Sequence, residues 1–448
     1  MLQGTTAPVS RRQVLHRAGA VALAAGVGAS MIIPGRASAQ QKTLKILHWK
    51  HFVPGYETWF SETYVKEWGE KNNTRVIVEN VSQGDIPHLA AEETKAQHGH
   101  DLFTYIFPLP AYEDEVIDHR EIYEECERQY GKAHDLALKT TYNPKTQKFW
   151  GFADYYLVLL TNYRKDLWDA VGTVPDTWED VRQGGRKIKL LYDKPLGIGL
   201  GGDSDAETSV RSLLYAFGAS EQDADNRPVL KSPAALEAFK FVKALYEETM
   251  TADVLTWDPA SNNRLMLEGA GSLVLNAISI TRTAENKQLS VGEQIWLAPV
   301  PQGPAGRLTP VNGFQSYLIW KFAKNIDGAK QFLVDYMGHF RHGFLASELY
   351  NTPCFPHTVP DLQTLYAHDP KATPPDKYKV LADAGTWTTH FGYPGYTNAA
   401  IAEIYNSGLL GQMMGQAATG KLTPEEALAQ ADAEIQRIFQ KWRTRGKL

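Results

Sequence analysis

The 448-residue sequence predicts an α/β protein with two domains behind a cleaved leader. Short apolar strands alternate with amphipathic helices from about residue 44, and this order is typical of a mostly parallel sheet covered by helices on both faces. A leader of 39 residues leaves about 409, which is more than one ordinary hydrophobic core contains. With 43% hydrophobic and 11% aromatic residues, the chain has ample material for packed cores.

The first 39 residues have the three parts of a signal peptide. Arg11 and Arg12 precede an uncharged run over residues 18–33, and Ala37-Ser38-Ala39 has the small-x-small pattern that a signal peptidase recognises. Paired arginines before a weakly apolar run indicate the twin-arginine translocase. The run is shorter than the roughly 20 residues of a membrane-spanning helix. We therefore expect folded export, cleavage after Ala39 and release as a soluble protein of the periplasm.

The charge balance excludes some classes of partner. The leader holds four arginines and no acidic residue, so 42 basic and 51 acidic residues remain, a net charge of −9. Nucleic acids and anionic membranes attract basic surfaces, and neither is expected as a partner.

Cys126 and Cys354 are the two cysteines of the chain. An oxidising compartment permits a disulfide between them, but the sequence does not tell whether their Cα atoms are close enough for one. Both states stay open. No cysteine lies near the cleavage site, so a lipid anchor is not expected.

The elements that follow the leader alternate between strand and helix. They are a strand at 44–49, a loop with Pro54-Gly55, an amphipathic segment over 59–68, a strand at 75–81, a helix at 86–97 and a strand at 101–106. Ligands of such sheets bind at the carboxyl ends of the strands. Residues 48–52 and 105–109 are therefore expected at a ligand site.

The C-terminal segment predicts a helix with one buried face. Thr423 is a good N-cap, Pro424 suits the first helical position, and Glu425 and Glu426 favour the positive end of the helix dipole. The apolar residues that follow recur at steps of three and four: Leu428, Ala431, Ile435, Ile438, Phe439 and Trp442. They are expected to pack.

Four passages resemble one protein family. They are Thr161–Trp168 with Val174–Asp180, Leu267–Asn276, Pro299–Pro304 with Asn312-Gly313 and Asp327–Leu333, and Thr419–Leu428. In this order they resemble the type 1 extracellular solute-binding proteins of ABC importers, which include the maltose-binding type. The resemblance covers nearly the whole mature chain.

The resemblance implies a two-lobed periplasmic-binding-protein-like fold with a central ligand cleft and several hinge crossings. Its landmarks place lobe one at 40–155 plus 294–338, and lobe two at 156–293 plus 339–448. Cys126 and Cys354 then fall in separate lobes. The implied activity is capture of a small solute by a monomer, followed by delivery to the transmembrane permease subunits.

Aromatic and polar residues near the expected cleft are the candidate ligand-binding residues. They are Trp49, His51, Phe52, Tyr105, Phe107, Tyr155, Tyr156, Asp203, Trp257, Asp258, Asn276, Asn312, Phe314, Trp387 and Tyr393. Aromatic faces cover the C–H surfaces of a sugar, while amides and carboxylates bond its hydroxyls. The alternatives are core packing for Trp49, helix capping for Asp203 and a surface loop for Trp257, Asp258, Trp387 and Tyr393.

The ligand class stays open at this point. Many sugar-binding relatives place Gly and then a stacking Trp after the residue equivalent to Asn276, whereas Ala277-Ile278-Ser279 follows here. A sugar or related polyhydroxyl compound is the leading hypothesis. A polyamine, an organic cation or another small polar molecule on the same fold is the alternative.

Other motifs do not support a metal, a cofactor or an enzyme. His48 with His51, and His98 with His100, lack further ligands at zinc spacing. Residues 197–202 match G-x-G-x-x-G by letter, but Lys194-Pro195 interrupts the preceding strand, which favours a glycine-rich strand end and turn. Common hydrolase and P-loop motifs are missing, so a secreted enzyme is the weakest hypothesis.

Overall fold

The computed structural model describes residues 41–448, and the predicted signal peptide at 1–39 lies outside them. Two main sheets organise this part of the chain. One has six strands in the order β13-β6-β12-β3-β1-β2, and the other has four in the order β10-β7-β9-β8. Within residues 41–448, no helix is both long and apolar enough to span a bilayer.

The six-stranded sheet contains the strands predicted at the start of the mature chain. Its strands are β1 (Lys42–Trp49), β2 (Thr74–Val81), β3 (Leu102–Tyr105), β6 (Phe152–Leu157), β12 (Gly313–Ile319) and β13 (Thr352–Pro353). β1 is parallel to β2 and β3, but β12 is antiparallel to β3 and to β6. The expected parallel arrangement therefore holds for β1, β2 and β3 only, because β12, β6 and β13 are joined to their neighbours by antiparallel pairing.

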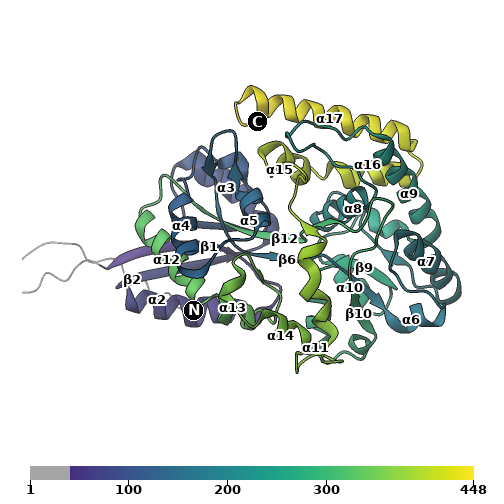
Figure 1. The fold of residues 1–448 in the computed structure, drawn as a ribbon, viewed down its shortest axis with the longest axis horizontal. Coiled ribbons are helices and arrows are strands. Elements are labelled where there is room, and N and C mark those ends of the chain that lie inside the picture. The colour runs from purple at the N-terminus through teal and green to yellow at the C-terminus, as the bar shows by residue number, and fades with distance from the viewer. Residues whose placement is uncertain (1–40) are drawn as a thin grey trace, which may run out of the picture. The chain divides into compact units, whose positions relative to one another are not determined.

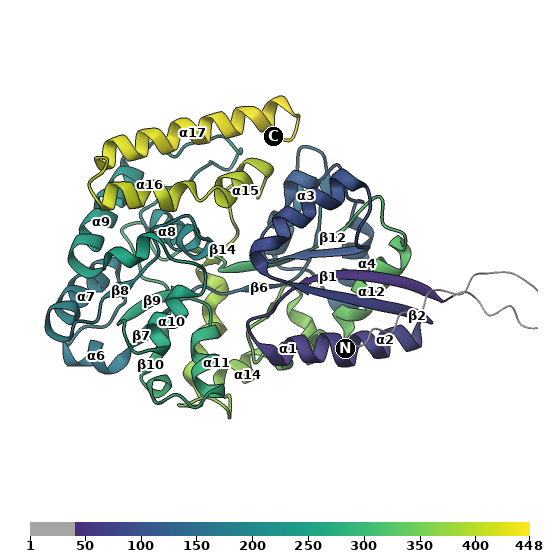
Figure 2. The same ribbon diagram turned by 180° about the vertical axis from the view of Figure 1, so that it is seen from behind.

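Helices cover both faces of this sheet, with α1 and α2 on one side and α3 on the other (Figures 1 and 2). The helices associated with this half of the chain are α1 (Pro54–Thr58), α2 (Val65–Lys71), α3 (Ile86–Ala96), α4 (Arg120–Tyr130), α5 (Asp135–Thr141), α12 (Ile326–Gly338) and α13 (Phe340–Ala346). The helix predicted at 86–97 is confirmed as α3. The loop predicted at Pro54-Gly55 is wrong, because Pro54 occupies the first position of α1.

A π-helical turn, Trp59–Tyr64, joins α1 to α2. Tyr56, Phe60, Tyr64 and Trp68 recur every four residues through it, and all four are buried. A step of four drifts around an ordinary α-helix, and the wider π turn offsets that drift. The aromatic residues therefore stay on the face that packs against the sheet.

The four-stranded sheet organises the middle of the chain. Its strands are β7 (Leu160–Arg164), β8 (Leu196–Gly197), β9 (Leu273–Asn276) and β10 (Ile295–Ala298). β9 is antiparallel to β7 and parallel to β8, while β10 is antiparallel to β7. Two smaller pairs, β4 (Tyr142–Asn143) with β5 (Lys148–Phe149) and β11 (Thr309–Pro310) with β14 (Thr388–Thr389), lie outside the main sheets.

The remaining helices belong to the middle and the end of the chain. They are α6 (Lys165–Ala170), α7 (Trp178–Tyr192), α8 (Ser204–Ala216), α9 (Pro233–Thr249), α10 (Ser261–Leu267), α11 (Ser279–Asn286), α14 (Leu362–Ala367), α15 (Ala399–Asn406), α16 (Leu409–Ala418) and α17 (Pro424–Thr444). Helix α17 lies along α16 and α9 in both views (Figures 1 and 2).

Strand pairing differs from the expected lobe assignment in two places. β10, expected in lobe one, pairs with β7 of the four-stranded sheet, and β13, expected in lobe two, pairs with β6 of the six-stranded sheet. Cys354 follows β13, and its N–H donates to the carbonyl of Asp154 in β6. Cys354 therefore belongs with the six-stranded sheet, as Cys126 in α4 does. Both cysteines are free and buried.

The predicted C-terminal helix is confirmed as α17. Thr423 and Glu426 form a reciprocal capping box at its start, and the apolar face predicted from the spacing is buried in full. Beyond the helix, Lys447 Nζ lies 2.6 Å from Asp114 Oδ1, so the chain end contacts the segment that follows β3.

We expect Ile435→Ala in α17 to lower the free energy of unfolding by about 2–4 kcal/mol, because Ile435 is fully buried and the lost methyl groups leave a cavity. Urea denaturation of the mature protein measures the change. Gln440→Ala, on the exposed face of the same helix, is the matched control and should stay within about 0.5 kcal/mol of the wild type. Equal effects of the two substitutions would contradict the packing assigned to α17.

Candidate ligand-binding cleft

Two adjoining cavities open where β1, β2 and β3 end. The larger has a volume of about 860 Å³. It is lined by Lys50, His51, Phe52, Ser82, Gln83, Gly84, Pro87, Tyr105, Gly202, Ser204, Asp258, Pro259, Ala260, Tyr405 and Asn406. The first eight of these follow or end the three parallel strands, and the others come from the start of α8, the segment before α10 and the end of α15.

The smaller cavity lies beside the larger and shares Phe52, Gln83 and Pro259 with it. Its volume is about 20 Å³. The residues that line it are Phe52, Gln83, Ile106, Phe107, Leu157, Asp205, Pro259, Asn263, Asn276, Ser279, Asn312 and Tyr350. We call the larger space the outer cavity and the smaller one the inner cavity.

An aromatic wall runs along one side of these cavities. The ring centroid of Phe107 lies 5.5 Å from that of Tyr105 and 4.8 Å from that of Tyr405. Phe391 packs against Tyr405 from behind with its ring centroid at 4.9 Å. The Tyr405 hydroxyl donates to the carbonyl of Ser204 at 2.9 Å, which fixes the ring against the start of α8. This wall can cover the C–H face of a ligand.

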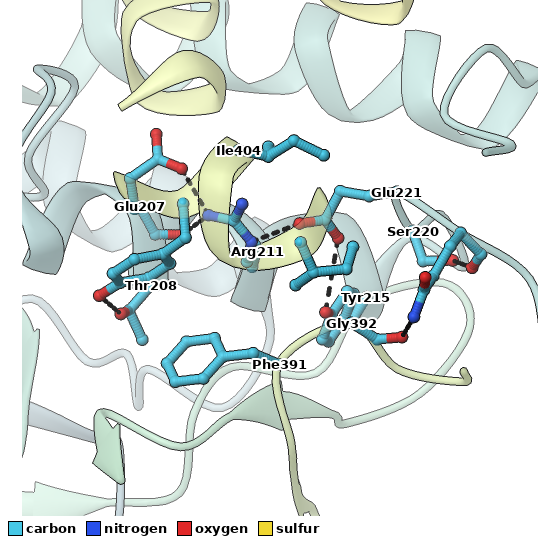
Figure 3. A network of polar contacts seen from close by, with 12 residues as sticks. Glu207, Thr208, Arg211, Tyr215, Ser220, Glu221, Phe391, Gly392 and Ile404 are labelled. Atoms are coloured by element: carbon cyan, nitrogen blue, oxygen red, sulfur yellow. Dashed lines mark hydrogen bonds and ion pairs between the residues drawn. The ribbon is translucent and has the colours of Figure 1, made fainter. Parts of the chain in front are cut away.

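A buried charge network of Arg211, Glu207 and Glu221 packs against the ring of Tyr405. Figure 3 shows Arg211 between the carboxylates of Glu207 and Glu221, at 2.6 Å and 2.5 Å. All three side chains are fully buried. The Arg211 guanidinium lies 5.2 Å from the ring centroid of Tyr405, and Glu207 accepts the backbone N–H of Gly411. The network therefore ties α8 to α15 and α16 at the cleft wall.

An amide cluster forms the floor of the inner cavity. Asn276, at the end of β9, donates through Nδ2 to Asn262 at 2.9 Å and to Asn263 at 2.7 Å. Its Oδ1 accepts from Asn312 Nδ2 at 3.1 Å. Asn262 in turn donates to Asp205 Oδ2 at 2.7 Å. These polar groups lie in fixed positions because each is held by another.

His51 is held as a neutral imidazole. Its Nε2 lies 3.0 Å from Asn351 Oδ1, and its Nδ1 accepts the backbone N–H of Val53 at 2.9 Å. Burial lowers the pKa of His51 to about 3. His51 therefore contributes no positive charge to the outer cavity at neutral pH.

The structure places seven of the fifteen predicted residues on the cavity walls: His51, Phe52, Tyr105, Phe107, Asp258, Asn276 and Asn312. Their contact with a ligand stays a prediction. The loops after β1 and β3 do line the cavities, as expected from the rule that sites lie at the carboxyl ends of parallel strands.

Four predicted aromatic residues belong to the core of the sheet instead. Trp49 is fully buried, and its indole N–H donates to the hydroxyl of Tyr155 at 3.1 Å. Tyr155, Tyr156 and Phe314 are likewise buried within or beside the paired strands. They do not line either cavity because side chains alternate between the two faces of a strand, and these point into packing layers.

The other four predicted residues also lie off the cavity walls. Asp203 caps α8, since its Oδ1 accepts the N–H groups of Asp205 and Ala206. Trp257 packs beside Gly197, and Trp387 is buried next to β11. Tyr393 is 37% exposed and lies beside Tyr215. The capping alternative therefore fits Asp203 and the surface-loop alternative fits Tyr393, whereas Trp387 is buried.

Several wall residues are missing from the predicted set, namely Gln83, Asn263, Ser279, Tyr350 and Tyr405. Gln83 follows β2, so the rule that identified the loops after β1 and β3 also identifies it. Tyr350 and Tyr405 come from distant segments, and no local pattern marks them.

The glycine-rich motif at 197–202 is a strand end and turn, as expected. β8 ends at Gly197, and α8 begins at Ser204. A side chain at position 411 of α16 would come within 2.1 Å of the Gly201 carbonyl, so the glycines allow close packing of α16. Among the residues that the structure describes, no group of three or more His, Cys, Asp or Glu could hold a metal ion.

Comparison with known proteins points to the family that the four sequence passages resemble. Residues 126–347 match the family described as bacterial extracellular solute-binding protein. A binding protein of Brucella abortus (strain 2308) is 25% identical over 172 residues, which make up 37% of this chain and 41% of that relative. The chain thus matches less than half the length of this curated relative.

Solved structures share the fold over nearly their whole length. A solute-binding protein from Thermotoga lettingae TMO bound to α-D-tagatose has a TM-score of 0.72 and 18% identity, with 89% of this chain and 100% of that chain covered. A protein from Agrobacterium radiobacter K84 in complex with ribitol has a TM-score of 0.71 and 18% identity over 89% and 98%. Maltose-bound T. maritima MalE3 has a TM-score of 0.70 and 17% identity over 88% and 99%. The predicted α/β fold of two-lobed binding proteins is confirmed.

We expect Trp49→Ala to lower the free energy of unfolding by about 3–5 kcal/mol, because it empties a fully buried site and removes the bond to Tyr155. Phe52→Ala, three residues later on the cavity wall, should cost less than about 1 kcal/mol, since Phe52 is 42% exposed. Urea denaturation of both variants makes the comparison. A Trp49→Ala variant as stable as Phe52→Ala would show that Trp49 does not belong to the core.

Proposed function

Because the chain has the family match and the fold of bacterial extracellular solute-binding proteins, we propose that it is the substrate-binding component of an ABC importer for a small solute with several hydroxyl groups. The family and its structural relatives are binding proteins. In this proposal the chain captures the ligand, and the permease carries the ligand across the membrane.

The single observation that carries this proposal is the composition of the cleft. An amide and carboxylate floor lies beside a wall of aromatic rings, and both border cavities at the carboxyl ends of parallel strands. Amides and carboxylates bond hydroxyl groups, and aromatic rings cover the apolar faces between them. The relatives bound to tagatose, ribitol and maltose support a ligand of this class.

The proposed mechanism is closure of the two sheet regions about the segments that connect them. The chain passes from β6 to β7 at residues 158–159 and from β10 to β12 at residues 299–312. A third passage follows β13. Connections between the two sheets allow hinge motion, and a ligand bound between the regions favours the closed form that the permease recognises.

The mature protein is proposed to act in the periplasm as a monomer. The leader supports this location, since its paired arginines and small-x-small site indicate folded export and cleavage after Ala39. The twin-arginine translocase would then be a partner during export only.

A thermal-shift screen of sugars, alditols, polyamines and amino acids, followed by calorimetry, tests the proposed ligand class. A sugar or alditol should raise the melting temperature and be recovered unchanged. Asn312→Ala should then weaken its binding tenfold or more, since it removes a hydrogen-bonding group of the floor and one of the two donors to the Asn276 oxygen.

Asn286→Ala is the matched control for this test, because it removes an exposed amide of α11 that lines neither cavity. Its affinity should equal that of the wild type. Chemical conversion of the bound compound would contradict a binding function, and stabilisation by polyamines or amino acids alone would contradict the ligand class.

Replacing Arg11 and Arg12 by Lys tests the export route. The double variant should accumulate inside the cell in its uncleaved form, because the translocase recognises the paired arginines. Cell fractionation with immunoblotting measures the distribution. Arg17→Lys, in the same leader, should be exported normally, and export of the double variant at the wild-type level would exclude this route.

A further inference from the structure

The inner cavity is small enough to limit what enters it. Its free volume of about 20 Å³ is close to the space of one water molecule, so it accepts one terminal group of a ligand. The rest of the ligand would lie in the outer cavity, which adjoins it through Phe52, Gln83 and Pro259. The chemistry of the inner walls therefore selects one functional group.

Two acceptors of the inner cavity can bind a donor on a ligand. Asn312 is 94% buried, and its Oδ1 has no hydrogen-bond partner within residues 41–448, while its Nδ2 is bound to Asn276. Asp205 contributes a carboxylate whose Oδ2 accepts from Asn262 at 2.7 Å and from Asn276 at 3.5 Å, and a carboxylate has further acceptor capacity. The Asn276 amide is hydrogen-bonded through both its nitrogen and its oxygen, so its role is to hold Asn262, Asn263 and Asn312 in position.

The charge of Asp205 has no cationic partner in the described part of the chain. No Lys, Arg or His lies within 4.0 Å of its carboxylate there, and His51 is neutral. The basic groups near the cleft are occupied or remote, since Arg264 pairs with Asp258 and Lys50 lines only the outer cavity. The N-terminus of α8 offsets about half a charge.

We propose that the ligand carries a primary ammonium group that enters the inner cavity and binds Asp205 and Asn312. This inference rests on the proposed function and narrows its ligand class to amino sugars and amino alditols. An ammonium group donates three hydrogen bonds and accepts none, which matches a cavity that offers acceptors and a buried negative charge. A hydroxyl satisfies the acceptors but leaves the charge uncompensated.

Binding of an ammonium should depend on pH. Burial, with Asp203 nearby, raises the pKa of Asp205 to about 7 in the free protein. An ammonium binds the ionised carboxylate, so affinity should fall by about tenfold as the pH is lowered from about 8 to about 6. A neutral alditol has no such requirement.

The other titratable and charged groups around Asp205 do not reverse the expected loss of affinity at lower pH. Burial also raises the pKa of Asp203 at the α8 cap, so it titrates in the same direction. Burial raises the pKa values of Tyr350 and Tyr405 above the range tested, and Arg264 lowers that of Asp258.

Calorimetry with matched pairs tests the proposal: glucamine against sorbitol, and galactamine against galactitol, because these alkylamines stay protonated at pH 8. The amine of the best pair should bind at least tenfold more tightly than its hydroxyl counterpart at pH 8. Asp205→Asn should remove that preference and its pH dependence, so that the amine and the hydroxyl member of a pair bind the variant with similar affinity. Asp253→Asn, an equal charge change on an exposed residue away from both cavities, should alter neither.

The outcomes separate the two proposals. Equal or tighter binding of the hydroxyl members would overturn the ammonium site and leave the proposed function standing. Binding of no member of any pair would count against the proposed function and the ammonium site together. Should Asp205→Asn fail to fold, the pH dependence of the wild type decides, since a flat profile for glucamine overturns the ammonium site.

Discussion

The side-chain amide of Asn276 is hydrogen-bonded through both its nitrogen and its oxygen at the end of β9, where the four-stranded sheet meets the segment that returns to β12. An amide buried at this point without partners would cost about 1–3 kcal/mol for each unsatisfied group. Asn262, Asn263 and Asn312 therefore must stay in place as long as the fold is intact. The cleft floor is consequently as rigid as the sheet from which it extends, and a ligand meets acceptors that are already oriented.

The aromatic wall depends on a second buried polar arrangement. Arg211 compensates two fully buried carboxylates, and its guanidinium lies against the ring of Tyr405. Removing charges from water is costly, so such a network persists only where each member is bonded to another. Here the network links α8 to α15 and α16, and α15 carries Tyr405 at the cavity edge. Packing far from the ligand thus determines the position of a ring beside it.

The fold of this chain does not by itself determine which ligand the chain binds. The solved relatives share the fold at 17–18% identity, a level at which the architecture persists while the cleft residues diverge. The family's stacking position, the second residue after Asn276, holds Ile278 here, and the aromatic surface comes from Tyr105, Phe107 and Tyr405 instead. The ligand class is therefore inferred from the donors, acceptors and charges of this cleft.

The sequence alone determined the features that depend on local patterns. Apolar alternation identified β1, β2 and β3, and the capping residues and the three-and-four spacing identified α17 with its buried face. The order of motifs indicated the family whose description matches residues 126–347. The rule that sites lie at strand ends placed His51, Phe52, Tyr105 and Phe107 on the cavity walls.

Only the tertiary structure decided what depends on contacts between distant segments. Trp49 and Phe52 are three residues apart, yet one is core and the other lines the cleft, because the direction of a side chain depends on which layer the strand packs against. Tyr350, Tyr405 and Asp205 meet from separate parts of the chain, and β10 and β13 join sheets that their positions in the sequence do not indicate. Long-range pairing of this kind leaves no local periodicity, and it is what sets the composition of the site.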